Sequence, residues 1–79
     1  MKSEDEWAEQ AKRIVRTEMV RNGVSYEGLV ERLATLGVHD TSVNMRNKIA
    51  RGKFTAVFFL QCLEAVGCYT VQMRERVNE

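Results

Sequence analysis

Residues 24–37 read VSYEGLVERLATLG, and this stretch has the beginning, the period and the end of one amphipathic helix. Ser25 suits the N-cap position, because its hydroxyl can accept a hydrogen bond from a free N–H of the first helical turn. Apolar residues follow at helical spacing, at Leu29, Val30, Leu33 and Leu36. Gly37 ends the pattern, since glycine tolerates the left-handed cap conformation. The stretch therefore predicts a helix over residues 26–36.

The same signals on either side predict further helices over residues 4–21, 41–50 and 56–66. Capping residues mark their starts and glycines mark their ends: Ser3 with Glu6 and then Gly23, Asp40 or Thr41 and then Gly52, and Thr55 and then Gly67. The helix over 56–66 is apolar nearly all round and is expected to be the most buried. We therefore expect an all-α domain of four helices over residues 1–68.

The tail, residues 69–79, has a different period. Tyr69, Val71 and Met73 alternate with polar residues, which is typical of a strand. A lone strand has no partner within a helical domain, so it frays, packs loosely or pairs with the same strand of a second copy. We expect a strand-like tail that forms the dimer contact of a homodimer.

Composition and charge describe one small globular domain. The chain has 79 residues, of which 44% are hydrophobic and 29% charged, and its net charge is +1. Charge is uneven along the chain, because residues 41–63 contain four basic side chains and no acid. The charged N-terminus excludes a signal peptide, and the apolar run from Ala56 is too short to cross a membrane. We therefore expect a cytoplasmic protein without a membrane partner.

The sequence contains few residues of the types that form catalytic or metal sites. Cys62 lies within an apolar run and is expected to be a buried thiol, and Cys68 is the only other cysteine. With His39 as the only histidine, the chain offers no zinc set. His39 stands beside Asp40, but the sequence places no nucleophile next to them. We expect no enzyme activity, no cofactor, no metal and no small-molecule substrate.

The stretch VSYEGLVERLATLGV, followed by VNMRNKIARGKFTAVFFLQCLEAVG, resembles the helix-turn-helix domains of phage repressors and Cro proteins (the XRE type). The closing element Ile49-Ala-Arg51-Gly52-Lys53 is the most specific part of a likeness that covers residues 24–67. The core RNKIARG…FFLQCLEA is also similar to that of short, uncharacterised bacterial proteins. The first resemblance implies a sequence-specific regulator of transcription, a repressor of the phage or mobile-element type, which inserts the helix over 41–50 into the major groove of double-stranded DNA.

The third helix and the turn after it contain side chains that suit this role. Asn can bond adenine, Arg and Lys can bond guanine, and Ser and Thr suit phosphate oxygens. The candidate DNA-binding residues are Thr41, Ser42, Asn44, Arg46, Asn47, Lys48, Arg51 and Lys53. The sequence does not decide whether Asn44 or Asn47 faces the groove. The ordinary alternative is a solvated helix face, on which basic residues are favoured by the helix dipole alone.

Other charged and aromatic groups are interpreted as structural. Lys12, Arg13 and Arg16 are expected to form a solvated face paired with Glu9 and Glu18. Trp7, Phe54, Phe58 and Phe59 are expected in the core rather than in a base-stacking surface. The competing function is a protein-interaction module on a helix-turn-helix fold without DNA binding, such as an antitoxin-like or inhibitor adaptor, since the net charge is near zero.

Overall fold

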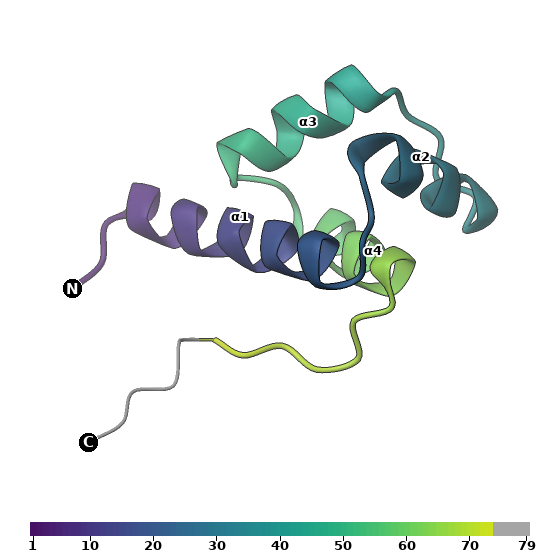
Figure 1. Cartoon of the computed structure of the whole chain (residues 1–79). Coiled ribbons are helices and arrows are strands. Elements are labelled where there is room, and N and C mark those ends of the chain that lie inside the picture. The colour runs from purple at the N-terminus through teal and green to yellow at the C-terminus, as the bar shows by residue number, and fades with distance from the viewer. Residues whose placement is uncertain (74–79) are drawn as a thin grey trace.

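The computed structural model of the chain describes residues 1–73 and contains four helices in that range (Figure 1). They are α1 (Glu4–Arg21), α2 (Tyr26–Thr35), α3 (Ser42–Arg51) and α4 (Ala56–Val66). The first and last have the predicted bounds, α2 ends one residue earlier than predicted, and α3 begins and ends one residue later. The prediction of an all-helical domain with four helices is therefore confirmed.

Local hydrogen bonds explain where each helix begins. The hydroxyls of Ser3, Ser25, Thr41 and Thr55 each accept a hydrogen bond from the backbone N–H three residues later. This contact satisfies one of the N–H groups that the first helical turn leaves unpaired. In α1 the Glu6 carboxylate also accepts a hydrogen bond from the backbone N–H of Ser3, at 2.7 Å, which completes a capping box.

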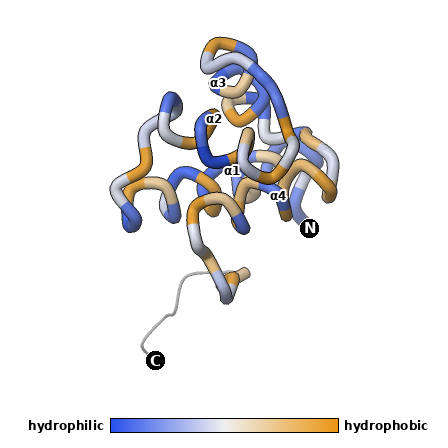
Figure 2. The backbone as a smooth tube through the Cα atoms, turned by 90° about the vertical axis from the view of Figure 1, so that its right-hand side faces the viewer, coloured by the Kyte–Doolittle hydropathy of each residue, from blue (hydrophilic) through white to orange (hydrophobic). Residues whose placement is uncertain are grey.

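The core lies where the inner faces of the helices meet. Its most completely buried side chains are Leu29, Leu33, Met45, Ile49, Val15 and Cys62. α1 and α2 each contact both α3 and α4, and the hydropathy of the tube alternates along the helices as expected for amphipathic elements (Figure 2). Because α3 packs on both α1 and α2, its inner face is fixed and its outer face remains exposed.

α3 ends where the backbone comes very close to α1. Gly52 adopts the left-handed conformation, with φ of +69°. A Cβ atom added to it would lie 2.1 Å from the carbonyl oxygen of Ala8, which is far inside van der Waals contact. Glycine is therefore required at this position for two reasons, its backbone conformation and the space available to it.

One prediction about the core is wrong. Trp7 is 52% exposed, because it lies near the start of α1, where this helix extends beyond the other helices (Figure 1). α4 is, as predicted, the helix with the most buried side chains among those described, although Val57 and Leu60 on its outer side are 65% and 64% exposed. The expectation for the phenylalanines holds better, since Phe58 is buried and Phe54 packs on it with ring centroids 5.5 Å apart.

The predicted strand of the tail does not form in the single chain. Tyr69 to Met73 form no strand, because no other extended segment among residues 1–73 offers a backbone for pairing. The segment instead passes along α1, where the side-chain amide of Gln10 donates a hydrogen bond to the carbonyl oxygen of Met73 (Figure 1). Residues 74–79 of the tail lie outside the described residues. None of the helices described has the length and apolar character needed to cross a membrane.

Candidate nucleic-acid interface

α3 presents two different faces. Met45 and Ile49, one turn apart, are completely buried, as predicted. Successive residues of an α-helix are rotated by about 100°, so the side chains opposite the buried pair are those of Val43, Asn47 and Arg51, with Asn44 and Ala50 at the edges of this face. All of these are exposed. The outward face of α3, defined by these residues, therefore contains no carboxylate.

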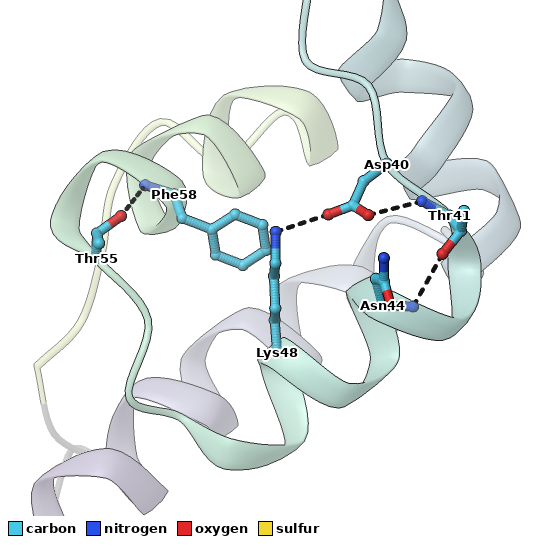
Figure 3. Close-up of polar contacts among 6 residues, drawn as sticks. All are labelled: Asp40, Thr41, Asn44, Lys48, Thr55 and Phe58. Carbon is cyan, nitrogen blue, oxygen red and sulfur yellow. Dashed lines mark hydrogen bonds and ion pairs between the residues drawn. The ribbon is translucent and has the colours of Figure 1, made fainter.

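The N-terminus of α3 is held by Thr41, whose hydroxyl accepts a hydrogen bond from the backbone N–H of Asn44 at 3.1 Å (Figure 3). Ser42 follows as the first residue of the helix and is partly buried. N–H groups at a helix N-terminus, together with nearby hydroxyls, suit the binding of a phosphate oxygen. The structure thus places Thr41 and Ser42 at the N-terminal end of α3.

Asp40, which was not among the predicted site residues, is a carboxylate beside the N-terminus of α3. Its Oδ2 lies 2.7 Å from the Nζ of Lys48, and its Oδ1 accepts a hydrogen bond from the backbone N–H of Thr41 at 2.8 Å (Figure 3). The hydrogen bond from Lys48, and then the one from Thr41, hold the pKa of Asp40 below its usual value. Asp40 therefore neutralises one of the predicted DNA-binding cations.

Lys48 is also held by an aromatic ring. Its Nζ lies 5.2 Å from the centre of the ring of Phe58, which belongs to α4 (Figure 3). A cation over an aromatic face is attracted by the electrons of the ring. Together with the ion pair to Asp40, this contact directs Lys48 toward the side of α3 that faces α4, away from the outward face.

Arg46 belongs to a cluster built from three helices. Its guanidinium carbon lies 4.8 Å from the ring centre of Tyr26 in α2. The hydroxyl of Tyr26 accepts a hydrogen bond from the Nε of Arg16 in α1, at 3.2 Å. Arg16 was assigned to a separate solvated face, so the sequence did not reveal this grouping. No local sequence signal could have done so, because the grouping depends on how the three helices pack.

Lys53 points to the start of α1. Its Nζ lies 3.1 Å from Oδ1 of Asp5 and 3.9 Å from Oε2 of Glu4. The hydrogen bond to Asp5 is the main reason that the pKa of Lys53 is raised. All three side chains are well exposed, so the pairs contribute little to stability and can be exchanged for other anions.

The basic side chains of this region therefore differ in the partners that they contact within the protein. Lys48 and Lys53 have carboxylate partners, and Arg46 has an aromatic one. Within residues 1–73, the side chains of Asn47 and Arg51 form neither a hydrogen bond nor an ion pair. These two groups on the outward face are available to an external ligand.

The predicted dimer residues are exposed but unpaired in the single chain. Tyr69, Val71 and Met73 are 90%, 40% and 62% exposed. The tail and α1 form the walls of an open groove of about 550 Å³, lined in part by Lys2, Arg13 and Arg21. Elsewhere in residues 1–73, the acidic, histidine and cysteine side chains form no group of three that is placed to hold a metal ion.

Comparison with known families adds one assignment. Residues 7–71 match a family described as a domain of unknown function (DUF6471). The chain belongs to the DUF6471 family. No curated protein and no solved structure matches the chain. The residues shared with DUF6471 extend from Trp7 in α1 to Val71 in the tail, so all of α2, α3 and α4 belong to the family domain.

Proposed function

We propose that this DUF6471 protein is a sequence-specific regulator of transcription, a repressor of the phage or mobile-element type, that inserts α3 into the major groove of double-stranded DNA. The observation that carries the proposal is the outward face of α3. It presents asparagine, arginine and apolar side chains without a carboxylate. Such a face suits base edges in the major groove, which offer hydrogen-bond donors and acceptors and thymine methyl groups.

The arrangement of α2 and α3 supports a helix-turn-helix interpretation. The two helices are connected by residues 36–41 and pack on each other, with Leu33 and Met45 completely buried. In a helix-turn-helix protein the second of the two helices enters the groove while the first crosses the DNA backbone. α3 and α2 take these positions in the proposed complex.

The basic residues beside the outward face are proposed to contact phosphates. Arg46 and Arg16 lie on the α2 side of α3, while Lys48 and Lys53 lie nearer to α4 and the start of α1. Many phosphates line each groove of DNA, and together they compete with a protein's own carboxylates for its exposed cations. On binding, Lys48 and Lys53 exchange their carboxylate partners for phosphates of the DNA.

A titration of DNA binding tests the proposal. Fluorescence anisotropy of a labelled random duplex, at salt concentrations from 50 to about 200 mM, should give binding with a steep salt dependence. The variant Arg46→Ala/Lys48→Ala/Arg51→Ala should bind much more weakly and with a shallower salt dependence. Lys2→Ala/Arg13→Ala/Arg21→Ala is the matched control, because it removes the same charge from the groove between α1 and the tail. Equal losses in both variants would contradict a specific role for α3.

We also propose a homodimer, in which the tails of two copies pair through Tyr69, Val71 and Met73. Two copies that read half-sites one helical turn apart gain affinity and palindromic specificity. The exposed side chains of Tyr69, Val71 and Met73 support this contact. Sedimentation analysis should show a dimer at high micromolar concentration and a monomer after deletion of residues 69–79. A dimer that survives the deletion would contradict the assignment.

A protein-interaction module is the second candidate, and the apolar surface of α4 favours it. Val57 and Leu60 are one turn apart and both largely exposed. Such a pair can contribute to a protein contact, although single exposed apolar residues are common. If this candidate is right, the duplex titration shows no binding at 50 mM salt, and the charge variants of α3 make no difference.

A further inference from the structure

Val43 is an exposed valine on the first turn of α3. Its side chain is 66% exposed, although valine is usually buried and its branched side chain disfavours helices slightly. It therefore contributes little to the core, where α3 is already anchored by Met45 and Ile49. An apolar group in this position is available to a ligand that offers a small apolar partner.

The geometry of α3 decides which polar residues share the face of Val43. Asn47 lies one turn further along on the same side, and Arg51 follows after another turn. Asn44 lies at the edge of this face, on the side of Asp40, where its amide contributes to the lowered pKa of that carboxylate. Asn47 therefore lies at the centre of the outward face and Asn44 at its edge, which favours Asn47 as the residue that faces the groove.

The spacing along this face corresponds to the spacing of base pairs. Residues four apart on an α-helix are separated by about 6 Å along its axis. Base pairs of DNA are stacked about 3.4 Å apart. Val43 and Asn47 would thus reach base pairs about two steps apart in a major groove, with Arg51 further along the same half-site.

We propose that Val43, Asn47 and Arg51 form the base-reading set, in which Val43 packs on the 5-methyl group of a thymine. Asn47 bonds the N6 and N7 edge of an adenine, and Arg51 bonds a guanine. This inference rests on the proposed function and deepens it by naming the half-site chemistry. The ligand is a duplex whose half-site contains a thymine methyl group within about two base pairs of an adenine.

The test removes that methyl group from the DNA. Tight-binding duplexes are first enriched from a random pool with the wild-type protein, and each thymine of the enriched site is then replaced singly by deoxyuridine. One replacement should weaken wild-type binding about fourfold, the factor that corresponds to one buried methyl group. Val43→Ala should bind the thymine and uracil duplexes equally. Val57→Ala is the matched control, because this valine is similarly exposed on α4, and it should keep the preference for thymine.

A second pair of variants tests the register. Asn47→Ala should lose discrimination at one adenine of the enriched site, whereas Asn44→Ala should keep it. Indifference of the wild-type protein to every uracil replacement, or the reversed result for the two asparagines, would overturn this inference and leave the proposed function standing. Failure to bind any duplex at low salt would overturn both.

Discussion

The Nζ of Lys48 lies 2.7 Å from Oδ2 of Asp40, the residue just before the N-cap of α3. A cation of the proposed DNA-binding surface is therefore already neutralised in the free protein. Because Thr41 also donates its backbone N–H to Asp40, the carboxylate is held at the N-terminus of α3 by two contacts. This position is also suited to a phosphate.

Loss of the Asp40 charge should strengthen DNA binding. Asp40→Asn keeps an oxygen that can accept the hydrogen bond from Thr41 but removes the charge that competes with phosphate. We expect the dissociation constant for duplex DNA to fall by about two- to fivefold, corresponding to an ion pair that is partly exposed. Anisotropy titrations at 50 mM salt measure the change. Glu64→Gln, which removes one exposed carboxylate from α4, is the control and should have a smaller effect. Weaker binding by Asp40→Asn would contradict the competition.

The same carboxylate should make stability depend on pH. The pKa of Asp40 is lower in the folded protein than the value of about 3.9 for an unfolded chain. The charged form therefore favours folding, and its contribution is present above about pH 4 and is lost as the pH falls through the folded-state pKa. Urea unfolding should show Asp40→Asn to be less stable than wild type at pH 6, by at most about 1 kcal/mol. The difference should shrink as the pH is lowered below 4. A difference that grows in acid would have the wrong sign for this mechanism.

The helices could be predicted because their signals are local. A hydroxyl such as that of Thr55 contacts an N–H only three residues away, and a glycine such as Gly67 needs only its own backbone to end a helix. The buried face of α3 followed from the spacing of Met45 and Ile49. These features require no knowledge of how the helices pack on one another.

The rest of the site depends on packing and could not be predicted. Arg16 and Tyr26 meet because α1 lies beside the start of α2, and Arg46 joins them from α3. The exposure of Trp7 follows from the extension of α1 beyond the other helices, which hydrophobic periodicity does not reveal (Figure 1). Only the position of Asp40 could have been inferred from the sequence, because it is an acidic residue directly before the N-cap of a helix that contains basic residues.

The two cysteines of the chain should differ sharply in their rate of alkylation. Cys62 is completely buried, and burial raises the pKa of its thiol to about 12, so it should remain protonated and shielded at pH 8. Cys68 is only partly buried, although burial raises its pKa too. Labelling with iodoacetamide at pH 8 should modify one thiol per chain in buffer and two in urea. Cys68→Ser should abolish labelling of the native protein, and Cys62→Ser should leave it unchanged. Similar rates for both native thiols would show that α4 opens readily.

The close approach of Gly52 to Ala8 leads to a prediction that separates the cost of the left-handed backbone conformation from the cost of a steric clash. Gly52→Ala forces an alanine into the left-handed backbone conformation. It also places a Cβ atom 2.1 Å from the carbonyl oxygen of Ala8, so α1 and α3 must move apart. We expect a loss of about 3 kcal/mol or more in the free energy of unfolding. Gly67→Ala is the matched control, because Gly67 ends α4 with φ of +84° but has open space around its Cβ position. It should cost only about 1–2 kcal/mol. Urea unfolding measures both, and equal losses would mean that α1 and α3 are not in close contact at this point.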